Sequence, residues 1–147
     1  MAVLPSLTTE FINTGKVRLI HRDFRLPQFQ FSKIAARYAN AAGTIGKYDV
    51  VANQLFLTQP DWAVNGNVDA TVAKVLSAAE IEKVRAIVKD DAHLDDATVK
   101  DEAMAMNVDH IQATPTVVVV YKGKREPISG GVSFALLKSY INGKLAE

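Results

Sequence analysis

The sequence of 147 residues contains no cysteine. This absence excludes disulfides, cysteine–zinc sites and iron–sulfur ligation within the chain, and every mechanism that needs a thiol of its own. Neither sign of charge is in excess, because 17 basic and 16 acidic residues leave a formal net charge of +1. A chain so nearly neutral gives no electrostatic indication of nucleic acid or of an acidic membrane surface as a partner.

Long apolar runs are also missing. No run approaches the roughly 20 residues that a membrane-spanning helix needs. The first ten residues, MAVLPSLTTE, lack the basic region and the long apolar region of a signal peptide. What the chain does have is an ordinary globular composition, with 48% hydrophobic and 22% charged residues. Its length is typical of one domain, so we predict a single domain over residues 1–147.

Strand-like periodicity occurs in two places. A predicted helix over residues 4–14, ending at Gly15, precedes the first predicted strand, residues 17–24, which carries apolar side chains on both faces. The second strand, Thr116–Tyr121, is a continuous β-branched run, the pattern of a strand buried on both faces. A tight turn and an antiparallel partner over Arg125–Ser129 follow it. These features predict two strands of a buried sheet and a C-terminal hairpin.

Between the two strand regions the period changes to 3.6, and we predict about five helices over residues 28–112. Their apolar faces comprise Phe31, Ile34, Ala35, Tyr38 and Ala42; Tyr48, Val51, Ala52, Leu55 and Phe56; Val72 and Leu76; Ile81, Val84, Ile87 and Val88; and Val99, Ala103 and Met106. Ser77 and Glu80 have the spacing of a capping box. A last helix, capped by Ser133, is predicted to bury Phe134, Leu137, Tyr140 and Ile141.

Four stretches occur in the order in which one known family has them: Phe11–Phe24, Gly46–Trp62, Thr114-Pro115-Thr116 and Gly130-Gly131. Together they resemble the thioredoxin superfamily, and within it the DsbA-like branch of bacterial disulfide oxidoreductases. The resemblance implies an α/β fold, a thioredoxin-like mixed sheet with an inserted helical block. Residues 17–27 and 113–147 would form the thioredoxin core, and residues 28–112 the helical insertion.

The sequence departs from that family at its start. In the family, a central strand and a Cys-x-x-Cys at the start of the first helix precede everything matched here, and the helix N-terminus lowers the pKa of the attacking thiol. We expect this chain to be N-terminally truncated, lacking that first strand and the motif. Two explanations stay open: Met1 is an internal methionine of a longer product, or the short chain is a natural redox-dead binding module.

The resemblance implies a thiol–disulfide oxidoreductase that acts on protein disulfides in the periplasm or another extracytoplasmic compartment. This chain contains no catalytic residue for that reaction, so we expect it to be inactive as it stands. The alternative is a redox-dead, thioredoxin-like module that binds peptides. A third hypothesis is a related enzyme whose serine or bound thiol cofactor lies in the missing segment. The expected partners are extended protein or peptide segments; no nucleic acid and no cofactor is expected.

Thr114 and Pro115 are the candidate substrate-binding residues. By resemblance they belong to the loop whose proline is cis in the superfamily, where the backbone of Thr114 would pair with a substrate peptide. A cis bond is tolerated at low cost only before proline. The alternative is that Pro115 simply marks the first residue of a buried strand.

Other polar or aromatic residues predict structure rather than chemistry. His93 with its neighbouring aspartates is interpreted as a solvated turn and not as a metal site, because hard-ion loops need ligands at alternating positions around a glycine. Those neighbours are Asp90, Asp91, Asp95 and Asp96. His21 is predicted to be partly buried, and Arg18, Arg22 and Arg25 form a small basic line. Trp62 is expected to pack within the helical block, with an exposed peptide-binding aromatic as the alternative.

A missing central strand also has a structural consequence. It would leave the apolar edges of residues 17–24 and 116–121 bare, and such edges pair readily with other chains. We therefore expect two chains to associate as a homodimer that covers these edges, or one chain to rearrange.

Overall fold

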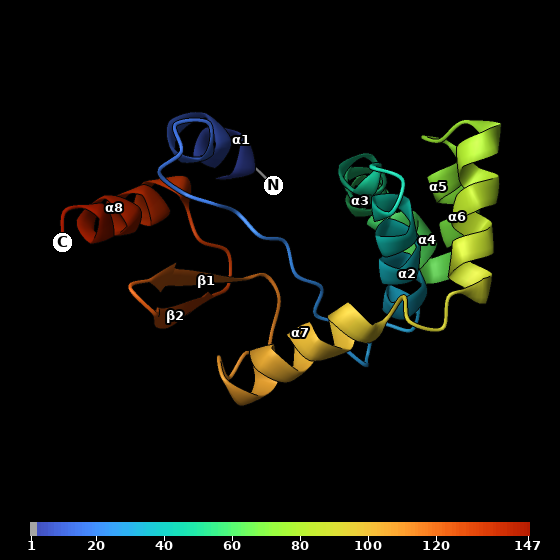
Figure 1. The fold of residues 1–147 in the computed structure, drawn as a ribbon. Coiled ribbons are helices and arrows are strands. Elements are labelled where there is room, and N and C mark those ends of the chain that lie inside the picture. Colours follow the sequence, from blue (N-terminus) through green and yellow to red (C-terminus); the bar gives the residue numbers. More distant parts are fainter. Residues whose placement is uncertain (1–2) are drawn as a thin grey trace. The chain divides into compact units, whose positions relative to one another are not determined.

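The computed structural model describes residues 3–147 (Figure 1). Its elements in chain order are α1 (Val3–Leu7), the π-helix η1 (Thr8–Ile12), α2 (Ser32–Gly43), α3 (Tyr48–Leu57), α4 (Gln59–Asn65), α5 (Val68–Ala73), α6 (Ala78–Asp90), α7 (Asp96–Asn107), β1 (Thr116–Tyr121), β2 (Lys124–Ser129) and α8 (Phe134–Leu145). This α/β arrangement, with a block of helices before a hairpin and a last helix, is the predicted one. None of the helices in residues 3–147 is long and apolar enough to cross a bilayer.

The described residues divide into two compact units. One consists of Met1–Arg22 with Ala103–Glu147, and the other of Asp23–Glu102. Each has a hydrophobic core of its own. The predicted single domain over residues 1–147 stays a prediction.

The core of the first unit is small. Its buried members are Leu7, Phe11, Leu137 and Ile141, and two valines of β1, Val117 and Val119, pack against them. The rings of Phe11 and Phe134 meet edge to face, with centroids 6.5 Å apart. The hydroxyl of Ser133 accepts the backbone N–H of Leu136, which confirms the predicted cap of α8. The hairpin and α8 therefore pack on the two short N-terminal helices.

The hairpin has the predicted turn. β1 and β2 pair antiparallel from Thr116↔Ser129 to Tyr121↔Lys124. Lys122 and Gly123 connect them with φ values of 46° and 78°. Positive φ at both central residues is the type I′ geometry, whose twist matches that of the flanking strands. The local sequence was therefore sufficient to predict this hairpin.

The predicted strand over residues 17–24 is absent, because these residues belong to no strand of the described chain. Leu19 and Ile20 are each 49% exposed, and His21, predicted to be partly buried, is exposed. β1 is also less buried than predicted, since Val120 is 58% exposed. A strand is buried on both faces only within a wide, covered sheet. The sheet of the described residues has two strands, so neither prediction of full burial holds.

The core of the second unit is built by α2 to α6. Ala41, Ala42, Val51, Val72 and Val84 have no exposed surface at all. Trp62 is 7% exposed, and its indole N–H donates to the backbone oxygen of Leu55 at 2.7 Å. This confirms the predicted packing role of Trp62 and removes the exposed-aromatic alternative.

The helical block differs from the prediction in number. The described residues 28–112 contain six helices, not five, because α4 follows α3 almost at once. Pro60 lies in the first turn of α4. A proline is tolerated there because the first turn has no use for its missing N–H. The capping box of Ser77 and Glu80 at α6 is present as predicted.

The apolar stripe predicted for α7 points outward. Val99 and Met106 are each 53% exposed, and Ala103 is exposed too. The buried residue of this helix is Thr98, which accepts a hydrogen bond from Asn40 at 3.1 Å. Periodicity identifies a stripe, but which face of a helix is covered depends on its neighbours.

Gly66 offers a test of the turn between α4 and α5. Its φ is 74°, and a Cβ added there would lie 2.8 Å from the Phe31 ring. Left-handed backbone costs a non-glycine residue about 1–2 kcal/mol, and the ring would have to move as well. We expect Gly66→Ala to lower the free energy of unfolding by roughly 2–3 kcal/mol, measured by urea denaturation.

Gly43→Ala is the matched control. Gly43 is helical, and an added Cβ would meet Tyr48 at 3.6 Å, an ordinary contact. This variant should stabilise the chain by up to about 1 kcal/mol. Equal effects of the two substitutions would contradict the conformational argument.

Candidate functional site

Thr114 and Pro115 lie in the loop between α7 and β1. The peptide bond that joins them is cis, as the resemblance implied. Both residues are exposed, and β1 begins at the next residue. The loop is therefore accessible at the start of the sheet, and its binding of a peptide stays a prediction.

A buried carboxylate holds the start of this loop. Asp109 is 6% exposed and accepts two hydrogen bonds from Arg125 of β2, from Nε and from Nη2, each of 2.7 Å. Parallel bonds between guanidinium and carboxylate fix direction as well as distance. The same bonds hold the pKa of Asp109 below its usual value and raise the pKa of Arg125. Both groups are thus charged at neutral pH.

The end of the loop is held by two further hydrogen bonds. The Gly130 N–H donates to the oxygen of Pro115 at 2.9 Å, and the Thr116 hydroxyl donates to the oxygen of Ala113 at 2.7 Å. Thr114 lies between these anchored ends. The pairing of Asp109 with Arg125 was not predicted from the sequence. An acidic residue ahead of a hairpin with several basic residues was the signal that indicates such a pair.

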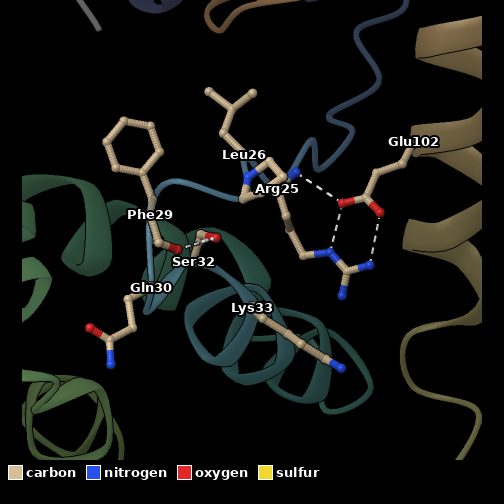
Figure 2. A pocket seen from close by; sticks show the side chains of 8 residues that line it. Arg25, Leu26, Phe29, Gln30, Ser32, Lys33 and Glu102 are labelled. Carbon is tan, nitrogen blue, oxygen red and sulfur yellow. Dashed lines mark hydrogen bonds and ion pairs between the residues drawn. The ribbon is translucent and has the colours of Figure 1, made fainter.

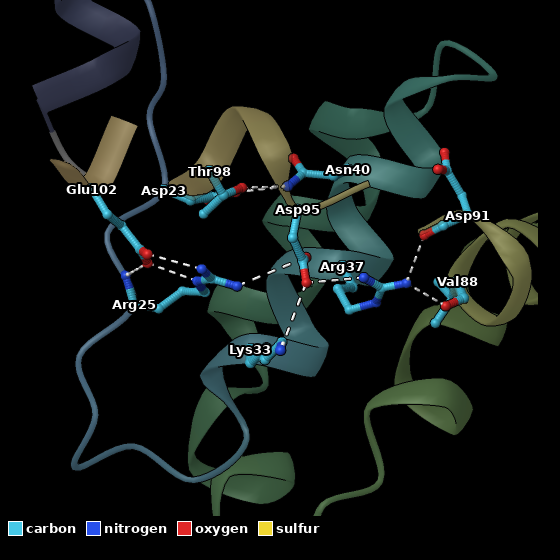
Figure 3. Close-up of polar contacts among 10 residues, drawn as sticks. All are labelled: Asp23, Arg25, Lys33, Arg37, Asn40, Val88, Asp91, Asp95, Thr98 and Glu102. Atoms are coloured by element: carbon cyan, nitrogen blue, oxygen red, sulfur yellow. Dashed lines mark hydrogen bonds and ion pairs between the residues drawn. The ribbon is translucent and has the colours of Figure 1, made fainter. Parts of the chain in front are cut away.

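A second polar cluster lies in the unit of residues 23–102, around Arg25 (Figure 3). Arg25 donates from Nε to one oxygen of Glu102 at 2.6 Å, from Nη2 to the other at 2.8 Å, and from its backbone N–H at 2.9 Å. Its Nη1 is buried without a hydrogen bond and lies 3.7 Å from Asp95. The side chains of Arg25 and Glu102 are 15% and 16% exposed. Arg25 is thus not part of an exposed basic line.

Arg37 extends this cluster towards α6. Its Nη1 lies 2.9 Å from Asp95, and its Nη2 donates to the backbone oxygens of Val88 and Asp91. The carboxylate of Asp95 lies between two arginines in Figure 3 and is 18% exposed. The prediction that placed Asp95 in a solvated turn is therefore wrong for this residue. His93 does have the predicted exposed position, 3.0 Å from Asp96.

A shallow pocket of about 260 Å³ lies beside Arg25 (Figure 2). Its lining residues are Arg25, Leu26, Pro27, Phe29, Gln30, Ser32, Lys33 and Glu102. Its charged groups already face opposite charges, because Arg25 binds Glu102 and Lys33 lies 3.8 Å from Asp95. The Lys33 side chain is 69% exposed and shares Asp95 with Arg25 and Arg37, so the pocket has no cation held in place for an ionic ligand. Among residues 3–147, no three His, Asp or Glu side chains are grouped so that they would hold a metal ion.

The chain belongs to the thioredoxin family, whose sequence model matches residues 2–141. Among curated proteins and among solved structures, nothing matches it. The match confirms the thioredoxin superfamily, and the α/β arrangement is that of a thioredoxin-like fold with a helical insertion. This member of the family contains no cysteine.

Glu102→Gln tests the Arg25 cluster through its pH dependence. Hydrogen bonds from Arg25 lower the pKa of Glu102, so the pair stabilises the fold above the ordinary Glu pKa of about 4.5 and loses this effect as the pH falls further. Glu102→Gln should cost about 2 kcal/mol at pH 7. In this variant the free energy of unfolding, measured by urea denaturation, should also fall less steeply between pH 5 and pH 3 than in the unsubstituted chain. The exposed pair of Glu82 and Arg85 provides the control, since Glu82→Gln should change stability by less than about 0.5 kcal/mol.

Asp109→Asn tests how the loop is held. Removing one charge of a buried pair leaves the other uncompensated, so we expect a loss of roughly 2–3 kcal/mol. Amide hydrogen exchange should accelerate at Ile111 and Gly130, whose N–H groups donate to the backbone oxygens of Ala105 and Pro115 at the two ends of the loop. Asp69→Asn is the control, because Asp69 accepts the same paired bonds from Arg85 in the other unit. Unchanged protection of Ile111 and Gly130 in Asp109→Asn would contradict the role of this ion pair.

Proposed function

We propose that this chain is the peptide-binding part of a thiol–disulfide oxidoreductase of the DsbA-like branch, and that alone it has no oxidoreductase activity. One observation carries the proposal: the chain belongs to the thioredoxin family and contains no cysteine. Thiol–disulfide exchange proceeds by attack of a thiolate on a disulfide sulfur, through a mixed disulfide. In this proposal the thiols, a Cys-x-x-Cys, and a central strand lie outside this sequence.

The peptide-binding part of the proposal is supported by the loop of Thr114 and Pro115. This loop is exposed, is held at both ends by hydrogen bonds, and leads directly into β1. Extended peptides bind to proteins by adding their backbone donors and acceptors to those of a strand. A loop fixed in advance loses little conformational entropy when a peptide binds.

The cellular location forms part of the same proposal. Disulfides form and persist in oxidising compartments such as the bacterial periplasm. An oxidoreductase of the DsbA-like branch would act there on extended protein segments, and we propose the periplasm as the location of the parent protein on the strength of the resemblance.

The purified chain should not accelerate the reduction of insulin by dithiothreitol, because it cannot form a mixed disulfide. It should still bind an extended peptide such as the reduced and alkylated insulin B chain. In a titration of the isotope-labelled chain, we expect amide shifts at Thr114 and Thr116. The amide of Ser77 at the start of α6 should stay unchanged. Acceleration of insulin reduction would overturn the first expectation, and shifts absent from residues 113–118 would overturn the second.

The intact mass and N-terminal sequence of the protein from its native cell separate this proposal from its alternative. A longer chain with Cys-x-x-Cys ahead of Ala2 is expected. A native chain that begins at Met1, still with peptide-dependent shifts at Thr114, would instead identify a redox-dead peptide-binding module.

A further inference from the structure

An Asn-Gly dipeptide, Asn65-Gly66, forms the turn in which α4 ends. An asparagine followed by glycine can lose its side-chain amide without a catalyst, because glycine has no Cβ that hinders attack by its backbone nitrogen. Asn65 is exposed, so water reaches it. The same dipeptide occurs at Asn142-Gly143 in α8. The chain therefore offers two sites with the same local chemistry in different surroundings.

A backbone donor is already directed at the reacting group of Asn65. The Asn67 N–H donates to Oδ1 of Asn65 at 2.8 Å. This oxygen takes up negative charge when a nucleophile adds to the side-chain carbonyl, and a donor held against it stabilises that charge. The turn thus favours addition to Cγ of Asn65.

The nucleophile, the backbone nitrogen of Gly66, becomes available when the last turn of α4 opens. Its N–H donates to the backbone oxygen of Trp62 at 2.8 Å, which is the bond that closes the helix. Helix ends open at low cost when little surface is buried there. Val64, the neighbour of Asn65, is 83% exposed, so this opening removes little apolar surface from contact.

The second Asn-Gly dipeptide is held more firmly. Asn142 lies within α8, and its backbone oxygen accepts the N–H of Ala146 at 3.2 Å. The residue before it, Ile141, is 6% exposed in the core of its unit. The Lys144 ammonium lies 3.3 Å from the carboxylate of Glu126 in β2. Opening the end of α8 therefore breaks helical hydrogen bonds and an ion pair beside the core.

We propose that Asn65 is a site of spontaneous deamidation, and that α8 protects Asn142 from the same reaction. The backbone nitrogen of Gly66 forms a bond to Cγ of Asn65. The side-chain nitrogen leaves as ammonia and takes with it the proton of the Gly66 N–H. Water then opens the resulting cyclic imide at either carbonyl, which leaves an aspartate or an isoaspartyl linkage. This inference is independent of the proposed function.

The product changes the turn in two ways. A carboxylate at residue 65 adds negative charge at the C-terminus of α4, where the helix dipole is already negative. An isoaspartyl linkage lengthens the backbone beside Gly66, where even an added Cβ would lie 2.8 Å from the Phe31 ring. The modified chain should therefore unfold at a lower urea concentration than the unmodified chain.

Peptide mapping during incubation in mildly alkaline buffer measures the two sites separately. Trypsin releases Asn65 within residues 48–74 and Asn142 within residues 139–144, and fragment ions locate the gain in mass and the isoaspartyl linkage. We expect Asn65 to react at least about fivefold faster than Asn142 in the native chain. In concentrated urea the two rates should become similar, because neither dipeptide then has a fixed structure.

Two substitutions of Asn67 isolate the contribution of its N–H. The φ of Asn67 is −76°, which proline can adopt, so Asn67→Pro removes the N–H whereas Asn67→Ala keeps it. The Asn67 side chain makes no cap hydrogen bond to α5, so alanine removes none. Asn67→Pro should slow the reaction at Asn65 by roughly threefold to tenfold, the effect of one hydrogen bond, and Asn67→Ala should leave it unchanged. Urea denaturation checks that both variants are folded, and Asn142 is the internal control.

Three results would overturn the proposal. The first is no gain in mass at Asn65 in the native chain over a period in which the unfolded chain reacts. The second is a reaction at Asn142 that is as fast as the reaction at Asn65 in the native chain. The third is an unchanged rate at Asn65 in a folded Asn67→Pro chain, which would remove the role of the backbone donor.

Discussion

A β-strand carries backbone donors and acceptors along both of its edges, and β1 has a strand partner along one of them among the described residues. The first unit depends on this constraint. It explains why its core has only four buried members, and why Val120, Leu19 and Ile20 are exposed although their sequences are typical of buried strands. The ion pair of Asp109 with Arg125 joins the loop to this small sheet where apolar packing is limited.

The second unit does not share this constraint, because helices satisfy their own backbone hydrogen bonds. Its core is closely packed around the alanines of α2, and paired charges link elements that are distant in sequence. Arg25 and Arg37 reach α7 and the end of α6, so the helical block is held by charge as well as by burial. Breaking such a pair costs more than the pair itself contributes, since it leaves one charge uncompensated.

A thiol–disulfide oxidoreductase combines two properties, redox chemistry and recognition of an extended chain. This chain belongs to the thioredoxin family but contains no cysteine, so the two properties can be considered separately. Redox chemistry requires a thiolate, whereas recognition of an extended chain requires only positioned backbone groups. In the proposed function, the loop of Thr114 and Pro115 supplies the second property.

The sequence by itself determined the features that depend on neighbouring residues. These include the capping box at Ser77, the turn at Lys122 and Gly123, the cap at Ser133, most helices and the absence of thiol chemistry. The loop of Thr114 and Pro115 was located through the family resemblance. Local signals suffice in such cases because capping and turn geometry involve residues only a few positions apart.

Only the tertiary structure decided which faces are covered and which charges meet. Arg25 and Glu102 are 77 residues apart, and no periodicity relates them. Leu19 and Ile20, and the stripe of Val99 and Met106, have the patterns of buried residues, yet each of these side chains is about half exposed. Burial is a property of two surfaces in contact, and a sequence pattern describes only one of them.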